Sequence, residues 1–206
     1  MLSLLFQSPL FFLIFAAALT TALTIHEFAH AFVADRLGDP TARLQDRLTL
    51  NPIKHLDPIG TAMLLFTGFG WGKPVPFDPY NLKNPRKDSA LIALAGPASN
   101  LLFALVLAIL YQVFGLTTYL PIFLALISLN VTLAVFNLVP IHPLDGGKII
   151  IGFLPLDLAR EWQGIMNRYG ILILIFMLFP FGNSASPVSY LISPIIDGVV
   201  KLLLFR

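Results

Sequence analysis

The sequence contains no cysteine and only four histidines among its 206 residues. Disulfide bonds, iron–sulfur clusters and thiolate zinc sites are therefore excluded, and any metal ion must be bound by histidine and carboxylate side chains. Charged residues make up 12% of the chain, against about 25% in soluble domains. This scarcity of charge excludes an ordinary soluble domain. The net charge of +2 is small, so we expect no nucleic acid as a partner.

Long apolar runs predict an all-α polytopic membrane protein, a bundle of four or five transmembrane helices in a single domain over residues 1–206. Within the segment 36–88, residues 57–77 are apolar but interrupted by glycine and proline, so we expect a re-entrant or interfacial loop there. The last apolar stretch, 188–205, either spans the membrane or lies along its surface. The predicted segments are a first helix at 9–35, a basic region at 36–88, helices at 90–114 and 119–139, a loop at 140–168 and C-terminal helices at 169–206.

The distribution of basic residues predicts the topology. Most of the 13 Lys and Arg lie between Arg36 and Lys87, and residues 115–118 contain none. Because basic loops face the cytoplasm, we expect 36–88 and 145–168 on the cytoplasmic side and 115–118 outside. The N-terminus is then outside, provided that 57–77 does not cross.

The first apolar run contains the sequence His26-Glu27-Phe28-Ala29-His30. Positions i and i+4 of a helix share a face, so both imidazoles can bind one metal ion, with Glu27 beside them. This is the pattern of zinc hydrolases. A chance match is the alternative, but an unpaired Glu within a membrane is costly, which favours a metal site.

Asp145 follows the third helix on the side where His30 is predicted to lie. A catalytic zinc takes three protein ligands, and Asp145 can be the third, although an Asp before Gly-Gly is also typical of a turn or helix cap. For His55 and His142 we favour an exposed or interfacial position over metal binding. Asn137 either donates a hydrogen bond to the substrate or a developing oxyanion, or bonds within the helices.

Small residues begin the second helix, in the sequence Gly96-Pro97-Ala98-Ser99-Asn100. Such residues permit close approach of helices, so we interpret Gly96 as a packing residue and expect Asn100 to bond across helices near the site.

These motifs together resemble the site-2 protease family of intramembrane zinc metalloproteases, in its short prokaryotic branch without PDZ or CBS domain. The resemblance covers roughly residues 20–155. It implies one Zn²⁺ bound by His26, His30 and Asp145, with Glu27 as the catalytic acid and base. The motifs that carry it are His26-Glu27-x-x-His30, Asn51-Pro52-x-x-His55, Gly96-Pro97-x-x-Asn100 and Asn137-x-x-Pro140-x-x-x-x-Asp145-Gly146.

We therefore predict a zinc-dependent endopeptidase that hydrolyses peptide bonds in transmembrane segments of membrane proteins, using a metal-activated water and Glu27 as general base and acid. Its expected partners are a transmembrane substrate and the lipid bilayer. Its expected location is the cell membrane, as a multi-pass protein with the active site toward the cytoplasm. An extended edge near Thr67–Pro76 could pair with the unwound substrate. The alternative function is a metal-ion transporter that uses the same residues as a transit site.

Overall fold

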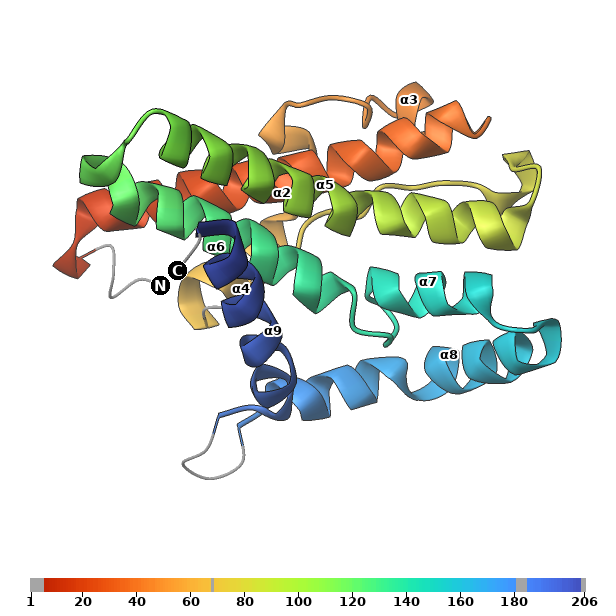
Figure 1. The fold of residues 1–206 in the computed structure, drawn as a ribbon. Coiled ribbons are helices and arrows are strands. Elements are labelled where there is room, and N and C mark those ends of the chain that lie inside the picture. The colour runs from red at the N-terminus through yellow and green to blue at the C-terminus, as the bar shows by residue number, and fades with distance from the viewer. Residues whose placement is uncertain (1–5, 68, 181–184, 205–206) are drawn as a thin grey trace.

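The computed structural model describes residues 6–67, 69–180 and 185–204, and its regular structure there is helical (Figure 1). The prediction of an all-α fold is confirmed. Among the described residues, extended chain pairs only in an isolated antiparallel bridge between Leu56 and Gly72. The α-helices are α2 (Pro9–Arg36), α3 (Thr41–Leu44), α4 (Pro58–Thr67), α5 (Pro85–Val113), α6 (Leu120–Asn137), α7 (Asp145–Phe153), α8 (Leu156–Leu178) and α9 (Pro187–Leu204), with 3₁₀ turns at Pro52–Lys54, Pro79–Asn81 and Thr117–Tyr119.

Four helices, α2, α5, α6 and α9, are long and apolar enough to cross a bilayer. The 28 residues of α2 extend about 42 Å at 1.5 Å per residue, which exceeds the hydrocarbon core of about 30 Å. Proline stands in the first turn of α2, α5 and α6, where its missing N–H costs no helical hydrogen bond. The chain is thus a multi-pass membrane protein, as the composition predicts.

Helices α2, α5 and α6 pack together through small residues. Helix α5 contacts both of the others, and α2 also contacts α6. Figure 1 shows these three helices running alongside one another while α9 crosses them. Small side chains let helix backbones approach closely, so long side chains of α2 can reach the backbone of α5. The buried alanines in this packing include Ala18, Ala22, Ala31 and Ala34 of α2, Ala93, Ala104 and Ala108 of α5, and Ala134 of α6.

The stretch 140–168, predicted as a loop, is largely helical. Helix α7 begins at Asp145 and packs against α5 and α8. Helix α8 begins at Leu156, earlier than the predicted start at residue 169. Its first half is amphipathic, with buried Ala159 and Met166, and amphipathic packing stabilises a helix that has no long apolar run. The charges in that half also explain why α8 is not among the four candidate spans.

Residues 57–77 do not cross as a continuous helix, as the sequence predicts. The 10 residues of α4 extend about 15 Å, roughly half of the hydrocarbon core. From Phe69 to Asp78 the described chain is without helix. It returns past His55, whose carbonyl accepts a hydrogen bond from Lys73 N–H at 2.8 Å.

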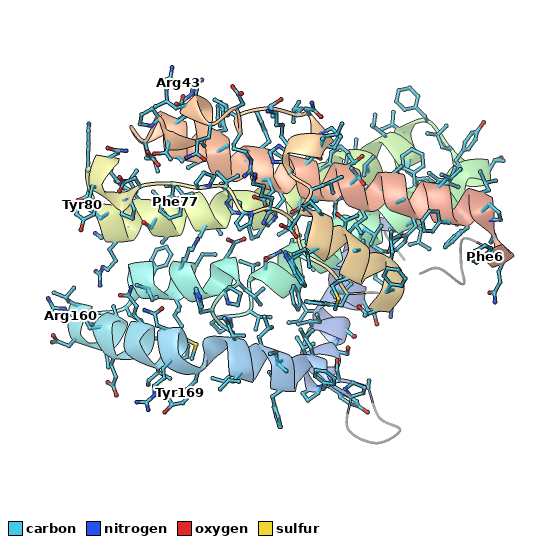
Figure 2. The ribbon with its side chains drawn as sticks, turned by 180° about the vertical axis from the view of Figure 1, so that it is seen from behind. Phe6, Arg43, Phe77, Tyr80, Arg160 and Tyr169 are labelled. Atoms are coloured by element: carbon cyan, nitrogen blue, oxygen red, sulfur yellow. The ribbon has the colours of Figure 1, made fainter. Side chains whose placement is uncertain are left out.

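The two ends of the molecule differ in charge. Figure 2 labels Phe6 at one end and Tyr80 and Arg160 at the other, with Arg43 in the same half as the latter pair. Phe6 is exposed to the surroundings, and the sequence near it is apolar. We call the end marked by Tyr80 and Arg160 the basic end. It lies beyond the C-terminus of α2.

Candidate metal centre

His26 and His30 lie one turn apart in the second half of α2, and both are buried. Their ring centroids are 4.6 Å apart, with the ring planes nearly perpendicular. The spacing of four residues therefore places both imidazoles on the face of α2 that packs against the other helices, as the sequence predicts.

The Nδ1 atoms of both rings are already bonded to acceptors. His26 Nδ1 lies 2.7 Å from Asn100 Oδ1 on α5, and His30 Nδ1 lies 2.7 Å from the Ile92 carbonyl on the same helix. A carbonyl oxygen only accepts, so each Nδ1 carries the proton and each Nε2 of the neutral ring has a free lone pair. Metal-binding histidines are oriented in this way by a bond at the second nitrogen.

The orientation of the Asn100 amide is fixed by its own partners. Its Nδ2 donates to the Ala22 carbonyl and to Asn130 Oδ1, each at 2.9 Å. Asn130 in turn donates to the Leu126 carbonyl. The bond of Asn100 across helices is therefore as predicted. The role of Asn130 was missed, although a buried Asn in an apolar helix is a signal of an interhelical bond.

Asp145, the first residue of α7, places a carboxylate oxygen beside the two Nε2 atoms. Its Oδ2 lies 3.1 Å from His26 Nε2 and 3.3 Å from His30 Nε2. Donor atoms on a tetrahedral zinc with bonds of 2.0 to 2.2 Å are about 3.4 Å apart. Two neutral imidazole nitrogens and one carboxylate oxygen at this spacing fit a zinc ion. In the described part of the chain, this is the one group of three His, Cys, Asp or Glu with ligand atoms within 4.8 Å.

Glu27 is buried beside the pair but is held by a different segment. Its Oε2 accepts a hydrogen bond from Val75 N–H at 3.0 Å. Val75 belongs to the extended stretch that follows α4. The group of three donor residues does not include Glu27, so its carboxylate can act on a water or a substrate instead of on the metal.

Helix α5 approaches the two imidazoles closely at Gly96. A Cβ atom at this position would lie 2.5 Å from His30 Nε2 and 2.6 Å from His26 Nε2. Any side chain at residue 96 would thus compete for the space in front of both metal-facing nitrogens. The interpretation of Gly96 as a packing residue is correct, and what it packs against is the imidazole pair.

Three other candidates lie outside the group. Asn137 Nδ2 donates to the Leu133 carbonyl of its own helix at 2.9 Å, and His142 is partly buried. The prediction that His55 is exposed or interfacial is wrong, because His55 is fully buried. Its Nε2 contacts the Thr49 carbonyl at 2.7 Å. The ring therefore connects the two ends of the turn 49–55, next to the point where Lys73 bonds the His55 carbonyl.

Comparison with known proteins bears on the identity of this centre. The family model for peptidase family M50 matches residues 14–120 and 113–177. The chain belongs to peptidase family M50, the site-2 protease family. It is therefore a zinc metalloprotease, and the resemblance read from the motifs is confirmed.

Individual relatives agree with the family. The chain is 39% identical over 198 residues to YwhC of Bacillus subtilis, covering 89% of this chain and 88% of that protein. It is 33% identical over 179 residues to Rip2 of Mycolicibacterium smegmatis, covering 81% and 67%. It is 28% identical over 150 residues to MJ0392 of Methanocaldococcus jannaschii, covering 72% and 35%. All three are named as zinc metalloproteases. No solved structure matches the chain.

Proposed function

We propose that this metalloprotease is an intramembrane endopeptidase that hydrolyses peptide bonds in transmembrane segments of other proteins. In this proposal one zinc ion is bound by His26, His30 and Asp145, and Glu27 transfers protons. The observation that carries the proposal is the convergence of two oriented Nε2 atoms and one carboxylate oxygen within the packing of α2, α5 and α7.

The chemistry divides between the metal and the protein. Zinc supplies Lewis acidity, lowering the pKa of water to about 7 and polarising the scissile carbonyl. Glu27 accepts the proton of the attacking water and delivers it to the leaving amide nitrogen. Because Val75 N–H occupies Oε2, we assign the proton transfer to Oε1. Asn137 is the proposed hydrogen-bond donor to the oxyanion, and for this its amide must leave the Leu133 carbonyl.

The location of the centre supports a membrane substrate. His26 and His30 are buried in a candidate span, in the half of α2 that is nearer the basic end. By the preference of basic loops for the cytoplasm, we propose that the active site faces the cytoplasmic side of the cell membrane. The whole chain, residues 1–206, is the proposed protease domain, and the bilayer and a transmembrane protein are its partners.

The extended stretch after α4 supports pairing with an unwound substrate only in part. The backbone groups of Lys73 and the carbonyl of Pro74 are already bonded to other residues. Gly72 also forms the bridge with Leu56, and the N–H and carbonyl of Phe69 contact Thr67 Oγ1 at 3.2 Å. The proposed pairing edge is therefore the backbone of Gly70 and Trp71. Deletion of 68–72, of which Gly68 lies outside the described residues, should abolish cleavage while zinc stays bound.

The test of the proposed function is the substitution Glu27→Gln. It should leave bound zinc unchanged, measured by metal analysis of the purified protein, and should abolish cleavage of a model transmembrane substrate. His26→Ala and Asp145→Ala should lose both zinc and cleavage. If Glu27→Gln instead retained cleavage, the proposed role of Glu27 in proton transfer would be refuted. If the wild type cleaved no substrate but moved metal ions across vesicle membranes, and Glu27→Gln stopped that flux, the transporter alternative would be favoured.

A further inference from the structure

Arg47 is a buried arginine in the segment 36–88. The basic residues of this segment indicate the cytoplasmic side of the membrane. Arg47 is only 4% exposed. Its Nη1 donates to the Pro74 carbonyl at 3.0 Å and its Nη2 to the Lys73 carbonyl at 2.6 Å. A planar guanidinium that bonds two consecutive carbonyls fixes their relative orientation. Arg47 therefore holds the backbone of residues 73–74 in place.

The backbone fixed by Arg47 has one N–H group that can bond a side chain of α2. Pro74 and Pro76 have no N–H, and Lys73 N–H is bonded to the His55 carbonyl. Val75 N–H is thus the only backbone donor within the sequence Pro74-Val75-Pro76, and it bonds Glu27 Oε2 at 3.0 Å. A chain of direct contacts connects Arg47, through segment 73–76, to the carboxylate beside the metal centre.

The charges are consistent with this connection. Burial lowers the pKa of Arg47, and the negative charge of Glu27 acts in the opposite direction. The two groups therefore interact electrostatically although the backbone of segment 73–76 separates them. Arg43 offers a contrast, since its side chain is mostly exposed and pairs with Asp35 at 3.0 Å.

We propose that Arg47 is a positioning residue for peptide hydrolysis, because it fixes segment 73–76 so that Val75 N–H holds the Glu27 carboxylate in its working orientation. The inference rests on the proposed role of Glu27. It predicts that Arg47 affects the rate of the chemical step, and that it does so without contacting the metal or its ligands.

The experiment measures kcat, KM and bound zinc for cleavage of a model transmembrane substrate by the purified full chain. Arg47→Met and Val75→Pro should each lower kcat by about 10- to 100-fold, since misplacement of a catalytic group by about 1 Å costs this much. KM and zinc content should not change. Arg47→Lys should recover part of kcat, because an ammonium can still bond one of the carbonyls.

Matched controls separate positioning from general damage. Arg43→Met removes an exposed arginine from the same region and should behave like the wild type. Val75→Ala shortens the side chain but keeps the N–H, so it should lower kcat much less than Val75→Pro does. In the double variant Arg47→Met/Val75→Pro, kcat should fall no further than in the worse single variant, because both substitutions break one path.

Several results would overturn the proposal. These are a wild-type kcat in Arg47→Met, a rise in KM alone, loss of zinc from a folded variant, or multiplied effects in the double variant. If Arg47→Met does not fold, Arg47→Lys and Val75→Pro decide the question. If Glu27→Gln cleaves as well as the wild type, the proposed function fails and this inference fails with it. If Glu27→Gln is inactive and Arg47→Met is not impaired, only the role of Arg47 is refuted.

Discussion

On one side of the candidate metal centre, α5 and α6 hold the two imidazoles of α2; on the other, the extended segment 73–76 holds Glu27. The helix side uses side-chain amides and a helix carbonyl, namely Asn100, Asn130 and the carbonyl of Ile92. The loop side uses a single backbone N–H between two prolines. The proposed metal ligands are thus fixed by packing of rigid helices, while the proposed proton carrier, Glu27, depends on a short segment that must itself be held in place.

The largest expected effect comes from placing a methyl group on the helix side. Gly96→Ala would put a carbon within 2.6 Å of both Nε2 atoms, so we expect loss of bound zinc and a drop in cleavage of at least about 100-fold. Metal analysis and the cleavage assay measure this.

Gly164→Ala is the matched control, because its added carbon meets no atom within 4 Å in α8. It should keep full activity and stabilise the helix by up to about 1 kcal/mol. Wild-type zinc content in Gly96→Ala would contradict the close approach of α5.

A smaller effect on the same side is expected from Asn100→Ala. This substitution removes the acceptor for His26 Nδ1, so the ring is no longer held in the tautomer that presents Nε2. Loss of such a partner weakens metal binding by about 10- to 100-fold. Competition with a zinc-binding dye measures the affinity. An unchanged affinity would mean that packing alone orients the ring.

On the loop side, His55→Phe tests how the returning chain is supported. The ring is fully buried and contacts the Thr49 carbonyl, so Phe fills a similar volume but leaves that carbonyl without its partner. We expect a stability loss of about 1 to 3 kcal/mol and a fall in cleavage that is smaller than that of Gly96→Ala. Thermal unfolding in detergent and the cleavage assay measure the two. A variant as stable as the wild type would show that the Thr49 bond is dispensable.

The smallest effect is expected away from the centre, at Asp39. Burial raises the pKa of this carboxyl, but hydrogen bonds from Thr41, Asn81 and Asp78 lower it more, so the folded-state pKa is below the usual value. The stabilisation is therefore present above the unfolded pKa of about 3.9 and is lost as pH falls through the lower folded value.

Asp39→Asn should cost about 1 to 2 kcal/mol at pH 7, and the difference from wild type should narrow below about pH 4. Thermal unfolding of the two proteins at pH 7 and at about pH 2.5, well below the ordinary carboxyl pKa, checks this. A difference that widens toward low pH would contradict the sign of the pKa shift.

The two sides also differ in how well the sequence predicted them. Helical periodicity alone places His26 and His30 on one face, and topology places Asp145 on the same side of the membrane. These signals act through regular geometry. Arg47 gave no such signal, because a basic residue after a membrane helix is already explained by the preference of basic loops for the cytoplasm.

The errors have a common physical origin. The polar turn around His55 predicts an exposed or interfacial ring, whereas the burial of the ring depends on Lys73 returning over it. The stretch 140–168 was interpreted as a loop because it has no long apolar run, yet α7 and α8 gain their stability by packing on one another and, for α7, on α5. Both depend on contacts between distant parts of the chain, which local pattern does not report.

His26 and Asp145 are separated by 119 positions in the chain. An ion bound by both would join the opening membrane helix to the start of α7, and because the unfolded chain has no preformed site, the free energy of binding would add to the stability of the folded protein. We therefore expect chelators to do more than inactivate the enzyme. In a zinc-starved cell the protein itself would become easier to degrade, so that metal supply would set how much of the protease survives.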